Sequence, residues 1–323
     1  MIIALSGGVG GAKLALGLSR ILKPEDLLVV VNTGDDFEHL GLSISPDIDT
    51  VAYTLAGLAN RELGWGRHDE TWSFMETMEA LGGETWFRLG DRDVALHVER
   101  TRRLRLGESL SAVTEALCRK MGIAQRILPM SDDPVRTRLL TDAGWLDFQE
   151  YFVHRRCEPV VSKLEFAGAA QAKAHPDFLA ALADPRLEAV VICPSNPFIS
   201  VEPILAIPGV RDAMIACAAP IIAVSPIIAG RAVKGPTAKM MTELGLDASA
   251  GSVAARYADL LDGYVIDHAD MSEVVSIDAR VTLAQTLMTT LEDREALARI
   301  VLDAAAVLRR RRTPRGQRHA AAR

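Results

Sequence analysis

The first 31 residues constrain the fold more than any other part of the chain. A short apolar run, Ile2–Leu5, leads into a glycine-rich turn at 6–11, and a helical pattern follows until Pro24. The next run, Leu27–Val31, is apolar at every position, which is typical of a parallel strand buried on both faces. Strand, turn, helix and strand make one βαβ unit, so we predict an α/β fold with a parallel sheet.

Two inserted segments interrupt the alternation of strands and helices after this unit. Helical periodicity predominates from about 47 to 122 and predicts a helical insertion. Its helices are expected at 47–59, 69–80, 91–103 and 108–121. Alternating runs then predict a β-hairpin or small mixed sheet within about 125–167. These runs lie at 126–129, 136–141 and 145–153.

The α/β rhythm returns in the last part of the chain. Strands are expected at 188–193, 220–224 and 264–267, and helices at 280–292 and 294–308. We therefore predict a Rossmann-like, doubly wound, mostly parallel sheet in a single domain spanning 1–308. The arginine-rich end, 309–323, is expected to be a frayed tail.

Composition excludes several classes of protein. The 323 residues are 49% hydrophobic and 24% charged, which is ample for a buried core and excludes wholesale disorder. No apolar run approaches the roughly 18 residues of a membrane helix, and the N-terminus lacks the features of a signal peptide, so we expect a cytoplasmic protein. Removing the seven arginines of the tail from the net charge of −6 leaves −13 on the first 308 residues, which disfavours nucleic-acid binding.

Polar clusters fall at the expected carboxyl ends of the strands, at 6–13, 32–36, 194–200 and 225–239. Ligands of doubly wound sheets bind at this edge. The glycines of the first cluster permit close approach of a phosphate to free N–H groups, although a turn made only for packing is the alternative. The segment lacks the Gly-Lys-Ser/Thr of a P-loop and the third glycine of a dinucleotide fingerprint.

Several carboxylates follow the second strand. Asp35 and Asp36 come directly after it, and Asp47 and Asp49 lie at the start of the next predicted helix. Carboxylates beside a phosphate site suit magnesium. We assign Asp47 to capping of its helix and expect Asp49 to project into the cleft, while Asp35 is alternatively a turn residue.

Three further segments carry candidate groups. Arg88 stands among aromatic and turn residues, where it could bind phosphate, stack on a flat ring or pair with a nearby aspartate. Two proline-bracketed loops offer hydroxyl and amide groups for a base or ribose, unless they are only turns. Their polar residues are Ser195, Asn196 and Ser225, with Lys234 further along as a phosphate ligand.

Together these segments resemble the CofD family, the transferases of deazaflavin coenzyme biosynthesis, called FbiA in actinobacteria. The matching stretches are SGGVGGAKL (6–14), VNTGDDFEHLGLSISPDIDTV (31–51), TWFRLGDRD (85–93), CPSNPFISV (193–201) and SPIIAGRAVKGP (225–236). The resemblance implies transfer of 2-phospho-L-lactate, phosphoenolpyruvate or 3-phosphoglycerate from a guanosine-diphosphate-linked donor. The acceptor would be the ribityl hydroxyl of the deazaflavin precursor Fo, and GMP would leave.

The resemblance also implies roles for particular residues. Asp49 and Arg88 would bind Fo and serve catalysis. The donor nucleotide would lie on the glycine turn and the proline-bracketed loops, namely on Gly8, Val9, Gly10, Gly11, Lys13, Asn32, Ser195, Asn196, Ser225 and Lys234. Mg²⁺ would be the cofactor, held by Asp36 and Asp49 with Asp35 as the alternative ligand, and a homodimer is expected.

This interpretation requires one cleft that joins 7–11, 49, 88 and 195–196. The alternative is a YvcK-like regulatory protein that binds nucleotide-sugars without transferase activity. The DIDTV and FRLGDRD segments favour the transferase.

Overall fold

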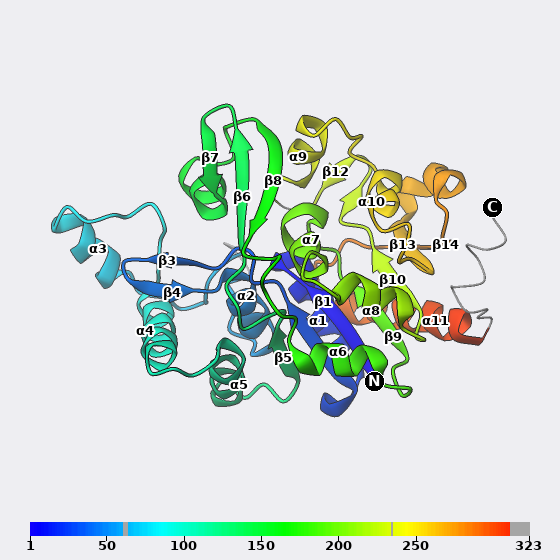
Figure 1. Ribbon diagram of the computed structural model, residues 1–323, viewed down its shortest axis with the longest axis horizontal. Coiled ribbons are helices and arrows are strands. Elements are labelled where there is room, and N and C mark those ends of the chain that lie inside the picture. Colours follow the sequence, from blue (N-terminus) through cyan, green and yellow to red (C-terminus); the bar gives the residue numbers. More distant parts are fainter. Residues whose placement is uncertain (61–63, 234, 311–323) are drawn as a thin grey trace.

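Seven parallel strands form the central sheet in a computed structural model of the chain, which describes residues 1–60, 64–233 and 235–310. Their order is β14-β13-β10-β9-β1-β2-β5 (Figure 1). The strands are β1 (Ile2–Ser6), β2 (Leu27–Val31), β5 (Arg126–Pro129), β9 (Ala189–Ile192), β10 (Ile221–Val224), β13 (Gly263–Asp267) and β14 (Arg280–Ala284). The chain winds outward from β1 to β5 and then returns to β9 on the other side of β1, so the predicted doubly wound fold is confirmed.

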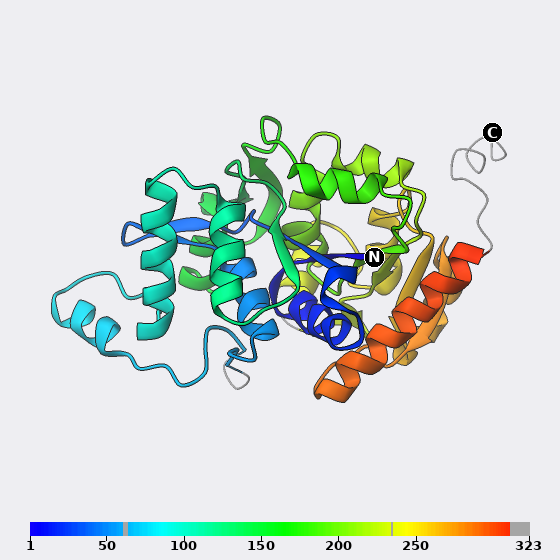
Figure 2. The same ribbon diagram turned by 90° about the horizontal axis from the view of Figure 1, so that it is seen from below.

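Both faces of the sheet are buried, and successive residues of a strand point to opposite faces. In β1, Ile3 and Leu5 belong to one core cluster and Ile2 and Ala4 to the other. Figure 2 shows helices on both sides of the sheet, with α1 and α11 packed together on one of them. That face is covered by α1 (Gly8–Ile21), α2 (Pro46–Leu55), α5 (Leu110–Lys120) and α11 (Leu291–Arg310). The other is covered by α6 (Pro176–Ala183), α7 (Glu202–Leu205), α8 (Val210–Ala216), α9 (Thr237–Glu243) and α10 (Ala250–Arg256).

The helical insertion extends from the sheet beyond β2. It contains the hairpin β3 (Phe37–His39) and β4 (Leu42–Ile44), followed by α2, α3 (Ser73–Ala80), α4 (Asp91–Arg105) and α5. Hairpin and α3 project to the left in Figure 1. A small separate core of Ile44, Met75 and Leu89 holds them together. The four predicted helices are confirmed, whereas the hairpin was not expected.

A second, antiparallel sheet stands beside this insertion, with the order β7-β6-β8. Its strands are β6 (Arg136–Thr141), β7 (Gly144–Asp147) and β8 (Val161–Ala167). The prediction is wrong in two details. The run 126–129 is the edge strand β5 of the main sheet, and the run 145–153 ends its strand at Asp147 and continues into a π-helical turn at Glu150–His154.

The carboxyl-terminal part departs from expectation at two places. The predicted helix at 280–292 is wrong, because Arg280–Ala284 pairs in parallel with β13 as strand β14. Arg309 and Arg310 belong to α11 and not to a tail, while 311–323 lie outside the described residues. Short 3-10 segments at Pro24–Asp26 and His268–Ser276, a π-helical turn at Pro197–Val201 and the two-residue strands β11 (Ile227–Ile228) and β12 (Arg231–Ala232) complete the chain. Among the described helices, none has the length and apolar character needed to cross a membrane.

Candidate functional site at the carboxyl edge of the sheet

The glycine turn after β1 packs directly on the loop after β9. Helix α1 begins at Gly8, so most of the predicted loop forms the first turn of the helix. Gly8 has a φ of +63°, which favours glycine. A Cβ at Gly10 would overlap the carbonyl oxygen of Pro194, and one at Gly11 would lie 2.5 Å from Ser195 Oγ. Close packing of the two loops therefore accounts for Gly10 and Gly11 without a ligand.

The polar residues of the proline-bracketed loops shape their own turns. Ser195 Oγ accepts a hydrogen bond from the N–H of Gly7 at 3.2 Å and donates one to the carbonyl of Gly7 at 2.8 Å. Asn196 Oδ1 accepts the N–H of Phe198 at 2.9 Å. Ser225 Oγ likewise bonds both backbone groups of Ile227. The structure brings Ser195 to the glycine turn, and nucleotide binding by these groups stays a prediction.

Asp47 has a different role from the predicted one. It lies inside α2 after the N-cap residue Ser45, whose side chain makes no capping hydrogen bond. The Oδ1 atom of Asp47 instead accepts the N–H of Gly8 at 2.5 Å, and its Oδ2 accepts Asn32 Nδ2 at 2.9 Å. The prediction that Asp47 caps its own helix is therefore wrong: it caps the positive end of α1. Asn32 also donates to the carbonyl of Ile199 at 3.1 Å and so links three loops.

Four carboxylates gather below this contact, each only 6% exposed: Asp35, Asp36, Asp47 and Asp49. Burial raises the pKa of Asp36 to about 7 and that of Asp47 to about 6. Burial, followed by the charges of Asp47 and Asp36, also raises the pKa of Asp35 well above its usual value. Asp36 Oδ2 accepts Ser45 Oγ at 2.9 Å, whereas its buried Oδ1 has no hydrogen-bond partner. Burial therefore disfavours the ionised forms of Asp35, Asp36 and Asp47.

Arg100 is the residue of this site that the sequence analysis missed. Its guanidinium is 2% exposed and binds both oxygens of Asp49, with Nη1 at 3.0 Å from Oδ2. Burial by itself lowers the pKa of Arg100, but the carboxylate of Asp49 outweighs it and the net pKa is raised. The spacing of Asp93, His97 and Arg100 along one face of α4 was the available signal.

Arg88 lies apart from the acidic cluster. It is exposed in the segment before α4, and its guanidinium is 4.4 Å from the ring centre of Trp72. Among the described residues it forms no ion pair, so the predicted pairing with Asp91 or Asp93 does not occur. Asp91 instead accepts the N–H of Phe74 at 2.9 Å. The structure thus leaves Arg88 available on the insertion and shows no contact with Asp49.

The two predicted lysines give different results. Lys13 Nζ donates to the carbonyl of Met288 at 2.9 Å, which ties α1 to the segment before α11. Lys234 lies outside the described residues. Phosphate binding by either lysine stays a prediction.

A cavity of about 240 Å³ opens beside Asp36. Its polar walls include Thr33, Glu38, Asp132 and Arg136. It does not reach the glycine turn, Asp49, Arg88 or the loop at 195–196, so this cavity is not the cleft expected from the sequence, and that cleft stays a prediction. Within the described ranges, no group of three or more His, Cys, Asp or Glu side chains has the arrangement of a metal site.

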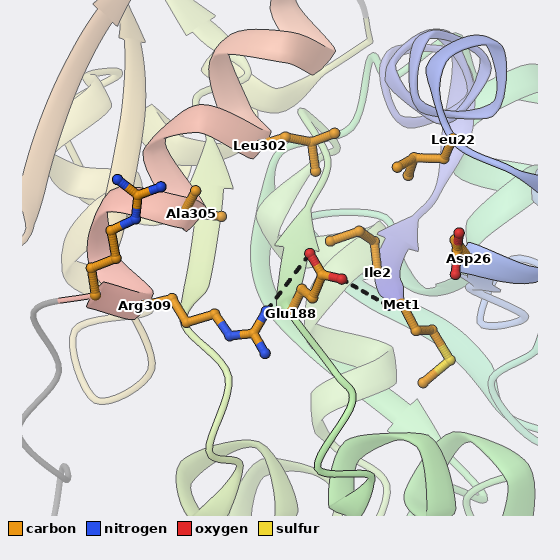
Figure 3. A pocket seen from close by; sticks show the side chains of 10 residues that line it. Met1, Ile2, Leu22, Asp26, Glu188, Leu302, Ala305 and Arg309 are labelled. Carbon is orange, nitrogen blue, oxygen red and sulfur yellow. Dashed lines mark hydrogen bonds and ion pairs between the residues drawn. The ribbon is translucent and has the colours of Figure 1, made fainter.

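A cavity of about 310 Å³ lies at the opposite, amino edge of the sheet (Figure 3). Glu188 crosses it and pairs with the N-terminal amine at 3.5 Å and with Arg309 at 3.7 Å. Apolar groups of β1 and α11 form much of the remaining wall, among them Ile2, Leu302 and Ala305. Glu188 thus has a charged partner on each side, whereas Asp36 at the carboxyl edge keeps a buried oxygen without a hydrogen-bond partner.

The fold and its polar edge define the class of protein. It is a doubly wound α/β protein whose polar loops gather between β1 and β9, where the strand order reverses and such proteins bind ligands. A family model described as 2-phospho-L-lactate transferase CofD matches residues 2–305, so the chain belongs to the CofD family.

Curated relatives agree with this membership over the whole chain. A phosphoenolpyruvate transferase of Kitasatospora aureofaciens is 42% identical over 313 residues, which is 95% of this chain and 97% of that protein. A 2-phospho-L-lactate transferase of Methanosarcina mazei is 40% identical over 306 residues, which is 94% of this chain and the full length of that protein. The predicted family is confirmed, and the chain is a transferase of the CofD type.

A solved structure supports the fold independently. A UPF0052 family protein of Bacillus halodurans matches with a TM-score of 0.63 over 93% of this chain and 98% of that protein. Its sequence is only 11% identical, so the likeness concerns the fold alone.

Proposed function

We propose that this protein transfers a phospho-acid unit from a guanosine-diphosphate-linked donor to the ribityl hydroxyl of Fo and releases GMP. The observation that carries the proposal is the match to CofD over residues 2–305, together with relatives named as transferases of phosphoenolpyruvate and 2-phospho-L-lactate. The buried carboxylates beside the glycine turn at the switch point support it, because such a site suits a phosphorylated ligand with a cation.

The proposed reaction is a displacement at phosphorus. The hydroxyl oxygen of Fo forms a bond to the phosphorus that bears the acid, and the bond from that phosphorus to the bridging oxygen of the pyrophosphate breaks. GMP leaves with the electron pair, and the proton of the hydroxyl passes to a base. Such a reaction depends mainly on positioning and on stabilisation of negative charge.

The first turn of α1 is the proposed place for the pyrophosphate. The first four N–H groups of a helix, counted from its N-cap residue, lack partners within it. Here Ser195 accepts that of Gly7 and Asp47 accepts that of Gly8. The N–H groups of Val9 and Gly10 remain for phosphate oxygens. Asn32 and Ser195 support this turn through their hydrogen bonds and would act on the donor by holding the loops in place.

The acidic cluster supports a proposed magnesium site that donor phosphates and water would complete, since the described carboxylates alone do not have the arrangement of a metal site. Asp36 has a buried oxygen without a partner, and the neighbouring carboxylates raise the pKa of Asp35 in addition to the effect of burial. A hard cation would relieve both, so we propose Asp36 as a ligand with Asp49 or Asp35 beside it. When bound, Mg²⁺ would neutralise charge on the donor pyrophosphate.

The acceptor is proposed to lie on the side of the helical insertion. Asp49 would orient the hydroxyl of Fo, since its carboxylate is fixed at the start of α2. Arg88, exposed and stacked on Trp72, would bind the deazaflavin ring or the donor phosphate. Because Arg88 and Asp49 are not in contact, the acceptor itself would bridge them.

The test is to incubate pure protein with Fo, a guanylylated acid donor and magnesium, and to measure GMP and the phosphodiester product. Stoichiometric GMP release is the expected result, and Asp49→Asn should lower it about 100-fold. Near wild-type transfer by Asp49→Asn would remove Asp49 from this role. Binding of a nucleotide-sugar without GMP release would instead favour the YvcK-like regulator.

Two finer points belong to the same proposal. Relatives named for two different acids are 42% and 40% identical, so a competition between the three guanylylated acids is the experiment that assigns the donor. We also propose a homodimer, which sedimentation of the pure protein would detect.

A further inference from the structure

A buried polar network joins helices α2 and α4 behind the proposed acceptor position. Asp49 and Tyr53 lie one turn apart on α2, and Asp93, His97 and Arg100 lie at helical spacing on α4. All five side chains are buried. They come from segments about 50 residues apart in the sequence, and α2 and α4 present them to each other.

The contacts of this network are directional. Arg100 Nη1 lies 3.0 Å from Asp49 Oδ2 and 3.1 Å from His97 Nδ1, and Nη2 binds the other oxygen of Asp49. His97 Nε2 lies 3.3 Å from Asp93 Oδ1, which also accepts the hydroxyl of Tyr53. The planar guanidinium of Arg100 thereby binds both oxygens of Asp49, which defines the orientation of the carboxylate.

Such a pair is a poor choice for stability alone. Removing two charges from water costs about as much as their attraction returns, and packed apolar side chains often serve equally well. A bidentate arginine does, however, hold a carboxylate in one rotamer. The pair therefore fits a need to present Asp49 in one orientation.

We infer that Arg100 is a positioning residue that holds Asp49 in the orientation in which it receives the acceptor hydroxyl, with His97 and Asp93 supporting Arg100 from behind. This inference rests on the proposed function and assigns to it a residue on α4 that need not touch either substrate.

A double-mutant cycle tests the inference. The variants are Asp49→Asn, Arg100→Met and the two combined, with kcat and KM for Fo and the calorimetric affinity for GDP as readouts. Each single variant should lower kcat/KM for Fo about 100-fold, and the combined variant should lose no more than Asp49→Asn alone, because Arg100 acts through Asp49. The affinity for GDP, measured without magnesium because Asp49 is also a proposed ligand of that ion, should stay within about twofold in every variant.

Two further variants separate positioning from folding. Arg100→Lys keeps the positive charge but not the two parallel N–H donors of the guanidinium. Its kcat/KM for Fo should therefore be about tenfold higher than that of Arg100→Met. Arg102→Met is the matched control, since Arg102 is exposed on α4 and its one ion pair within the described part of the chain is with Glu99 on the same helix. It should leave both kinetics and melting temperature unchanged. If Arg100→Met alone fails to fold, Arg100→Lys and the combined variant, which leaves no unpaired buried charge, still give the comparison.

The outcomes are distinguishable. Losses that multiply to about 10,000-fold in the combined variant would overturn the inference, because independent sites behave in that way. Full activity in folded Arg100→Met would do the same. Wild-type protein that neither binds Fo nor transfers to it would overturn the proposed function, and this inference with it.

Discussion

The two edges of the central sheet contrast in how they treat charge. At the amino edge, a cavity of about 310 Å³ holds Glu188 between the N-terminal amine and Arg309, and both side chains are more than half exposed. At the carboxyl edge, a smaller cavity of about 240 Å³ is lined by Asp36, one of four carboxylates there that are 6% exposed. One of these carboxylates has an oxygen without any hydrogen-bond partner.

This contrast shows why cavity size is a poor guide to function in this molecule. The ion pairs of Glu188 at the amino edge are solvated, which costs little and contributes little. At the carboxyl edge Asp49 is paired with Arg100, but Asp36 is buried with one oxygen unpartnered, which disfavours its ionised form.

The largest expected effect is a pH dependence of stability that originates at the carboxyl edge. The folded-state pKa of Asp36 is raised to about 7, so its protonated form is favoured in the fold. Stability should therefore be highest below the unfolded pKa of about 4 and fall as the pH rises through about 7, by at most about 4 kcal/mol from this group. Thermal melts from pH 4.5 to 7.5 should show a steeper decline for wild type than for Asp36→Asn. Parallel curves would contradict the assignment.

A second pair of variants separates packing from ligand binding. A Cβ at Gly10 would overlap the carbonyl oxygen of Pro194, and a Cβ at Gly17 would overlap that of Arg294 on α11. Gly10→Ala and Gly17→Ala should each cost about 1–3 kcal/mol in urea unfolding. Only Gly10→Ala should also weaken GDP binding measured by calorimetry. Equal GDP affinity in both variants would place the pyrophosphate away from the first turn of α1.

Arg88 offers a test on the exposed side of the site. Arg88→Met should raise KM for Fo about tenfold, while stability changes by less than about 1 kcal/mol because a single exposed cation–π contact is lost. Arg92→Met is the control, since Arg92 is exposed in the first turn of α4, and it should leave KM unchanged. An unchanged KM in Arg88→Met would remove Arg88 from the acceptor site.

The smallest effect is expected at the amino edge. Glu188→Gln removes exposed ion pairs and should change the free energy of unfolding by less than about 1 kcal/mol, with transfer activity unaffected. A large loss of transfer activity in Glu188→Gln would contradict the assignment of the functional site to the carboxyl edge alone. Measurement of GMP release beside a urea titration decides the question.

The sequence predicted the elements whose pattern is local. Leu27–Val31 is a buried parallel strand because it is apolar at every position, and the helices of the insertion follow from their 3.6-residue period. Arg280–Ala284 was predicted to be helical, yet β13 provides a neighbouring edge and the segment pairs with it. Edge pairing depends on a partner elsewhere in the chain, which periodicity does not record.

The residues of the candidate site were likewise predicted where the signal is local and missed where it depends on a distant partner. The glycine turn, the carboxylates after β2 and the two proline-bracketed loops were predicted as polar groups at strand ends, and the sheet brings their loops to one edge. Arg100 was missed because its partner Asp49 is 51 residues away in the chain. Asp47 was misassigned because the donor that it binds, Gly8, belongs to another helix.

The amino-acid sequence alone thus determined that the chain forms a parallel sheet, because the apolar periodicity of the strands and helices specifies it. It also determined which polar residues follow the strands, because glycine and proline mark the loops there. Tertiary structure alone decided which carboxylate meets which donor, which one remains without a partner and which arginine is buried beside them. Those relations depend on distances between helices that are set by packing, and no local pattern in the chain specifies them.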